Sequence, residues 1–122
     1  MSDATTRFFE DLDHRGYEPL LAKSSGALRL DLHEGPRTTH WLLRIDRGNV
    51  TVSREDLAAD TVVGTSPELF EDLVTGRENG LAALLRGDMR VSGDARLVVQ
   101  VDRLFPGPPQ AEGPRRYRKG VR

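Results

Sequence analysis

The sequence predicts an α+β domain in which one mainly antiparallel sheet of about five strands carries helices packed on one face. Two observations lead to this prediction. Apolar and polar residues alternate in three segments, residues 28–32, 41–45 and 50–52, as expected for strands with one buried and one solvated face. Helical periodicity appears before these strands and again after residue 66. Strands flanked by helices in this way suit a single sheet covered on one side.

Length and composition indicate one globular domain. The chain has 122 residues, and 37% hydrophobic with 30% charged residues separates it from disordered and fibrous proteins. The longest apolar run, residues 81–85, is far shorter than the roughly 18 residues that suggest a membrane span. Residues 1–4 have no features of a secretory signal, and the absence of cysteine excludes disulfides and thiolate chemistry. We therefore expect a cytoplasmic protein.

The N-terminal part predicts a helix and then a strand. We expect the helix over residues 4–15, because Asp3 can cap its start and Gly16 can end it. The strand follows at residues 28–33, where leucines alternate with polar residues. Gly35 and Pro36 then break the chain. The apolar stripe of the helix consists of Phe8, Phe9 and Leu12.

A hairpin follows this break. Its first strand places Trp41, Leu43 and Ile45 on one face, which we expect to contact the helices. Residues 46–49 form a tight turn in which glycine tolerates positive φ, and residues 50–53 alternate again. A fourth strand is expected at residues 61–65. The first three strands should therefore be antiparallel neighbours.

The C-terminal part predicts three helices and one further strand. Ser66 followed by proline starts the first of these helices, which ends at Gly76. Asn79 can cap a short second helix that ends at Gly87, and residues 88–92 form the fifth strand. Asp94 can cap the last helix, which proline-rich residues 106–109 end. The apolar positions of this last helix are Leu97, Val98, Val101, Leu104 and Phe105.

The spacing within residues 75–94 resembles the signature of sterol carrier protein type two domains. In that family a threonine–glycine pair, a short helix, a second glycine, a strand and a Gly–Asn/Asp step follow one another. Here the glycines of this pattern are Gly76, Gly87 and Gly93. The hairpin and the Ser66-capped helix also match the family pattern. The sequence departs from the family at residues 79–80, which are Asn–Gly where Asn/Asp–Pro is common, and at residues 84–85, which are leucines where an aromatic pair is common.

The resemblance implies an apolar tunnel between the sheet and the C-terminal helices. Members of the family bind sterols, fatty acyl chains or other lipids there and catalyse nothing. Each buried methylene contributes about 0.8 kcal/mol, so a long chain needs few polar contacts. The alternative is an interaction module of the same fold, with a close-packed core and a protein partner. The residues that we expect to line the ligand site are Trp41, Leu43, Phe70, Leu73, Leu81, Leu84, Leu85, Met89, Val101 and Phe105.

Catalytic and metal-binding motifs are poorly supported. The three histidines lack metal-site spacing, although His33 and His40 flank a loop near Asp31 and Glu34 that could hold a metal weakly. Ser66 precedes proline and suits a helix cap. The sequence has no nucleophile elbow, P-loop or dinucleotide fingerprint. We therefore expect neither a resident metal nor another cofactor.

The charge is distributed unevenly. Residues 106–122 hold five basic groups and one acidic group, so they carry +4, and the total of −1 leaves −5 for the rest of the chain. We expect residues 1–109 to form the domain and residues 110–122 to form a flexible basic tail. Such a tail can attach weakly to an anionic membrane. Nucleic-acid binding is the other reading of residues 115–119, but the acidic body and the lack of a reading motif disfavour it.

Overall fold

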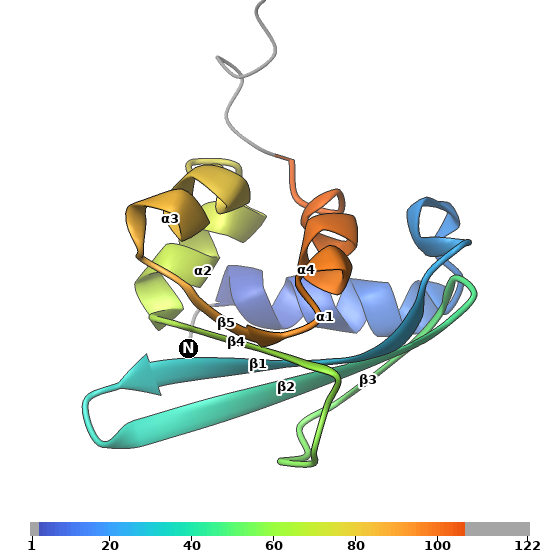
Figure 1. Cartoon of the computed structure of the whole chain (residues 1–122), viewed down its shortest axis with the longest axis horizontal. Helices are drawn as coiled ribbons and strands as arrows, with labels where there is room; N and C mark the ends of the chain where they lie inside the picture. The colour runs from blue at the N-terminus through green and yellow to red at the C-terminus, as the bar shows by residue number, and fades with distance from the viewer. Residues whose placement is uncertain (1–2, 107–122) are drawn as a thin grey trace, which may run out of the picture.

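The computed structural model describes residues 3–106, and the predicted tail lies outside this range. Figure 1 shows a single sheet with the helices gathered on one of its faces. The prediction of an α+β fold is confirmed. In chain order the elements are α1 Asp3–Arg15, a short 3-10 helix Pro19–Leu21, β1 Ser25–Glu34, β2 Arg37–Asp46, β3 Asn49–Ser53, β4 Thr61–Thr65, α2 Pro67–Val74, α3 Gly80–Arg86, β5 Arg90–Gly93 and α4 Ala95–Asp102.

The sheet has the order β3-β2-β1-β4-β5. As predicted, β1 pairs antiparallel with β2, and β2 pairs antiparallel with β3. The one parallel pair joins β1 to β4, because the chain crosses from the β3 edge of the sheet to the far side of β1. The edge strand β5 then pairs antiparallel with β4. The sheet is therefore mixed but mostly antiparallel, with β1 at its centre.

The caps predicted from the sequence form in the structure. The side chain of Ser66 accepts a hydrogen bond from the backbone N–H of Leu69 at 3.1 Å and starts α2. Asn79 accepts from Ala82 N–H at 2.9 Å and starts α3. Asp94 caps α4 in the same way. These side chains satisfy amides that the first helical turn leaves without partners, so the helices begin where the sequence predicts.

The core lies between the sheet and the helices. Trp41, Leu43 and Ile45 of β2 face it and are almost fully buried, which confirms the predicted register. The opposite face is less open to water than we expected, because Leu42 on that face is also fully buried. Residues 54–60 cross beneath the sheet there (Figure 1), and Arg29 Nη1 donates to the carbonyl of Leu57 at 3.1 Å. Within residues 3–106, no helix combines the length and the apolar character that a membrane span requires.

Candidate functional site

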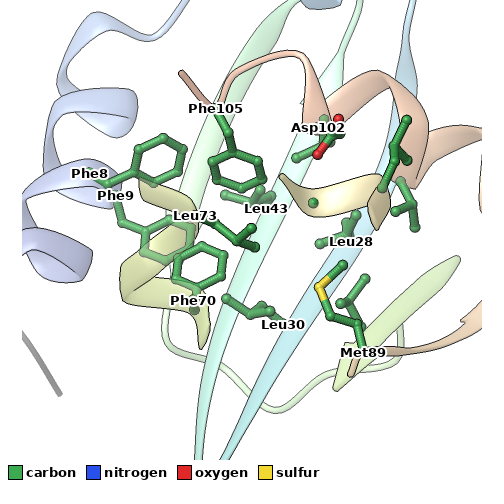
Figure 2. A pocket seen from close by; sticks show the side chains of 15 residues that line it. Phe8, Phe9, Leu28, Leu30, Leu43, Phe70, Leu73, Met89, Asp102 and Phe105 are labelled. Atoms are coloured by element: carbon green, nitrogen blue, oxygen red, sulfur yellow. The ribbon is translucent and has the colours of Figure 1, made fainter. Parts of the chain in front are cut away.

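An apolar pocket with a volume of about 50 Å³ lies between the sheet and the helices. The strands form one side of it through Leu28 and Leu30 of β1, Leu43 of β2 and Val63 of β4. Their alternation makes this possible, since every second side chain of a strand points to the same face. Met89, which immediately precedes β5, extends this wall. Figure 2 shows Leu28, Leu30, Leu43 and Met89 of this wall together with side chains from the helices.

Four phenylalanines form the helical end of the pocket. Phe8 and Phe9 come from α1 and Phe70 from α2, while Phe105 follows α4. The rings of Phe9 and Phe70 are stacked with centroids 5.4 Å apart, and those of Phe8 and Phe105 are stacked at 5.3 Å. Edge-to-face contacts at 5.6 to 6.2 Å link Phe70 to Phe105 and to Phe8. The result is a continuous aromatic wall built from distant parts of the chain (Figure 2).

Most of the residues predicted from the sequence lie together in the wall of this pocket. The helices α2, α3 and α4 each contribute a residue to the wall, because their apolar stripes turn toward the sheet. The pocket brings together Leu43, Phe70, Leu73, Leu81, Met89, Val101 and Phe105.

Trp41 is buried but lies outside the pocket wall. Its ring stacks on Phe9 with centroids 4.3 Å apart, and the guanidinium of Arg54 lies 4.2 Å from its ring centroid. Because Phe9 separates Trp41 from the pocket, Trp41 supports the aromatic wall from behind. Fluorescence of this single tryptophan would therefore report on a ligand only indirectly.

Leu84 and Leu85 of α3 also lie outside the pocket wall. Leu84 is partly buried against the core, whereas Leu85 is 88% exposed. The helix turns Gly80 and Ala83 inward, since small residues permit close packing on α2 and α4. This rotation moves Leu85 to the solvent side and leaves Leu81, at 38% exposure, at the rim of the pocket. Apolar spacing alone does not determine which flank of a short stripe is buried.

The sequence analysis did not assign eight of the wall residues to the site. The stripe of α1 could have identified Phe8 and Phe9, and the alternation in β1 could have identified Leu28 and Leu30, since both patterns were predicted to face the core. Gly80 and Asp102 had no such signal, because their role depends on how α3 packs on α4. The wall residues absent from the prediction are Phe8, Phe9, Leu28, Leu30, Val63, Gly80, Val98 and Asp102.

Asp102 is the only ionisable side chain among the wall residues that lie within the described range. Its carboxylate lies against Gly80, where a Cβ atom would collide with Oδ1 and lie 3.3 Å from Cγ. Burial raises the pKa of Asp102 above its ordinary value of 3.8. Within residues 3–106 no hydrogen bond or ion pair offsets this effect. An acidic group therefore lies at one edge of an otherwise apolar pocket (Figure 2).

A second set of charged residues, the outer-face cluster, lies on the sheet face opposite the pocket and consists of Arg29, Asp31, His40 and Asp56. Arg29 binds both carboxylate oxygens of Asp31 at 2.9 and 3.1 Å, and His40 Nδ1 lies 2.7 Å from Asp31 Oδ1. Burial opposes ionisation of Asp31, but the hydrogen bonds and positive charge of Arg29 and His40 outweigh it and lower the pKa of Asp31. Asp56, 3.1 Å from Arg29 Nη1, ties the segment after β3 to this cluster.

His33 and His40, which flank the turn between β1 and β2, contact different side chains. His40 interacts with Asp31, and His33 Nδ1 lies 3.1 Å from the hydroxyl of Thr38. Among the side chains of residues 3–106, no group of three or more potential ligands could hold a metal ion.

Comparison with known proteins places this chain in a family. The model of the SCP-2 sterol transfer family matches residues 7–106, so the chain belongs to this family of lipid- and sterol-binding or transfer domains. Peroxisomal multifunctional enzyme A of Dictyostelium discoideum is 26% identical over 90 residues, which are 72% of this chain and 20% of that protein. The chain therefore spans about a fifth of the length of this relative.

Solved structures of sterol carrier proteins share the fold. The apo form of Sterol Carrier Protein 2 from Yarrowia lipolytica has a TM-score of 0.67 at 17% identity, covering 85% of this chain and 92% of that chain. The palmitated SCP2L2 structure from Aedes aegypti has a TM-score of 0.64 at 18% identity, covering 88% and 97%. At these identities the likeness concerns the fold.

Proposed function

We propose that the chain binds a lipid, a fatty acyl or sterol-like molecule, between its sheet and its helices and passes it on without catalysing a reaction. The observation that carries this proposal is the pocket wall, which consists of apolar side chains from α1, α2, α4 and the strands. Asp102 alone brings an ionisable group to it, and the described wall contains no Ser, Thr, His or Lys. Such a wall favours transfer of methylene groups out of water but offers little acid–base or nucleophilic chemistry.

The pocket must enlarge for this function. Its volume of about 50 Å³ is well below the roughly 300 to 1,000 Å³ of typical ligand sites. The fold allows such enlargement, because the helices form a separate layer over the sheet and α3 is short and bounded by Gly80 and Gly87. The palmitated Aedes aegypti structure is a fold neighbour that carries an acyl chain, which supports a lipid of this class.

The direct test is equilibrium dialysis with hexadecanol, hexadecanoic acid and cholesterol. We expect at least one of them to bind with a dissociation constant in the micromolar range or below. Val101→Phe should weaken that binding at least about tenfold, because the added ring fills the pocket that Val101 lines. Val99→Phe is the matched control, since Val99 lies on the same helix but is 48% exposed, and it should bind within about twofold of the unmodified protein.

The small volume also favours the second candidate, an interaction module with a filled core. Leu81 and Leu85 on the exposed side of α3 would then be available to a protein partner. A well-folded protein that binds none of the three lipids would support this candidate. Equal lipid binding by Val101→Phe and Val99→Phe would place the ligand elsewhere on the molecule.

A further inference from the structure

The carboxylate of Asp102 is unusual among the partly buried acids of the described chain, because within residues 3–106 no hydrogen-bond donor or cation pairs with it. Other partly buried acids have donors: Glu18 accepts from Leu20 N–H at 2.9 Å, and Asp31 binds Arg29 and His40. Asp102 lies among apolar side chains with no donor within residues 3–106. Partly buried polar groups normally find a partner, because leaving one unpaired costs free energy. A group kept at that cost suggests a partner that residues 3–106 do not supply.

Within residues 3–106, neither neighbouring helix receives a capping hydrogen bond from the side chain of Asp102. Asp102 is the last residue of α4, where the helix dipole disfavours a negative charge. It lies beside Gly80 at the start of α3, but Asn79 already caps that helix through Ala82 N–H. The absence of a side chain at position 80 leaves the space that the carboxylate occupies. Helix capping therefore does not explain the residue.

The position of Asp102 assigns it to the entrance of the pocket. Asp102 and Leu81 both line the pocket and both keep part of their surface exposed, whereas Leu28 and Leu30 on the sheet side are buried. A chain that enters with its apolar end first would leave its polar end between α3 and α4, beside Asp102. An ionised carboxylate accepts hydrogen bonds and repels a second carboxylate.

We propose that Asp102 is the head-group anchor of the pocket and selects a long-chain ligand that ends in a hydroxyl, a hydrogen-bond donor, over one that ends in a carboxylate. This inference rests on the proposed lipid-binding function and adds the chemical class of the ligand's polar end. The hydroxyl O–H donates to Asp102 while the chain displaces the helices from the sheet. The partner that residues 3–106 do not supply is then the ligand itself.

The test compares 1-dodecanol, 1-methoxydodecane and dodecanoate by equilibrium dialysis at pH 7. The ether keeps the chain and the oxygen of the alcohol but cannot donate. We expect the alcohol to bind at least about tenfold more tightly than the ether, the size of one hydrogen bond to a charged group. Asp102→Leu should bring this ratio close to one. Asp102→Asn should keep part of the alcohol preference and bind dodecanoate better than the unmodified protein does.

Asp11→Leu is the matched control, because Asp11 is an exposed acid on α1 outside the pocket, and it should keep the unmodified preference. Melting temperatures at pH 7 and pH 3 provide a readout independent of ligand. Burial raises the pKa of Asp102, so the folded protein loses stability as pH rises through that pKa. Asp102→Asn should therefore gain more in melting temperature at pH 7 than at pH 3.

Three outcomes would overturn the inference. Equal binding of the alcohol and the ether by the unmodified protein would contradict the anchoring role of Asp102. It would leave the proposed lipid binding unaffected. A melting temperature that Asp102→Asn lowers more at pH 7 than at pH 3 would show a stabilising partner for the carboxylate within the fold. Binding of none of the three ligands by folded protein would reject the anchor together with the proposed function.

Discussion

At the scale of single residues, Asp31 shows how neighbouring donors keep a buried carboxylate ionised. Its side chain keeps only 11% of its surface exposed, yet Arg29 holds both oxygens and His40 holds one. Asp102 has no such partners within residues 3–106, and its pKa moves in the opposite direction. The surroundings of these two aspartates therefore shift their pKa values in opposite directions. The paired one lies on the outer face, and the unpaired one lies in the pocket wall.

Asp31→Asn should destabilise the protein at pH 7 by about 1 to 3 kcal/mol, because the substitution removes the carboxylate that binds Arg29 and His40 and leaves Arg29 only the exposed Asp56 as a charged partner. The pKa of Asp31 is lowered in the folded protein, so its contribution is complete above the ordinary value of 3.8 and is lost as pH falls through the folded-state pKa. The difference in free energy of unfolding between the two proteins should therefore shrink below about pH 4. Urea denaturation at pH 7 and pH 3 measures it.

Asp46→Asn serves as control, since the side chain of Asp46 is 80% exposed and pairs only with its neighbour Arg47. Its effect should be close to zero at both pH values, as for other exposed ion pairs. A loss for Asp31→Asn that is the same at pH 7 and pH 3 would indicate altered packing and contradict the electrostatic explanation.

Individual residues were predictable where one element decides their environment. Leu43, Phe70 and Val101 follow from the periodicity of a single strand or helix, and the structure places all three in the pocket wall. Leu85 and Asp102 depend on how α3 rotates against α4, which no local pattern encodes. The sequence therefore indicated the apolar wall better than it indicated the rim, where the ligand's polar end would lie.

At the scale of elements, glycines determine where helices and strands can approach each other. Gly87 has a φ of +86° and ends α3 in the left-handed conformation, with nothing within 4 Å of a Cβ placed on it. Gly93 has a φ of +96° and lies at the end of β5 against the backbone of Asp60 and Thr61. Gly87 is favoured only because of its positive φ. Gly93 is favoured because of its positive φ and because the neighbouring backbone leaves no room for a Cβ atom.

Gly93→Ala should therefore cost more stability than Gly87→Ala. The left-handed conformation costs about 1 to 2 kcal/mol in either variant. At position 93 the added Cβ would also collide with the carbonyl of Asp60 and lie 3.1 Å from Thr61 Cα, which adds about 1 to 3 kcal/mol of overpacking. Urea denaturation of the two variants gives the comparison. Equal losses in free energy of unfolding would mean that the backbone at the β4–β5 edge can shift to accommodate the added Cβ atom at position 93.

Elements were predictable because their ends carry side-chain caps. Residues 61–65 form the fourth strand as predicted, and Ser66, Asn79 and Asp94 cap the three helices that follow β3. The parallel pairing of β1 with β4 was not predicted. It joins segments separated by the whole β2–β3 hairpin, so no local turn fixes it.

At the scale of the whole molecule, the sheet and the helices are expected to differ in mobility. The central strand β1 has a hydrogen-bonded neighbour on each side, so moving it would break two ladders. The helix α3 has only seven residues and exposes Leu85 and Arg86 to water. Enlarging a pocket of about 50 Å³ should therefore displace α3 before it deforms the sheet.

This difference predicts a pattern of amide exchange. In the ligand-free protein the amides of α3 should exchange at least about tenfold faster than those of β1, because opening α3 leaves the sheet intact. A lipid that fills the enlarged pocket should slow exchange in α3 and raise the melting temperature, since a ligand at about 100 times its dissociation constant adds about 2.7 kcal/mol of stability. Hydrogen exchange measured without and with 1-dodecanol compares the ligand-free and the ligand-bound protein. If α3 exchanges as slowly as β1 in the free protein, the helical layer does not open independently, and a ligand could enter only through global unfolding or at another surface.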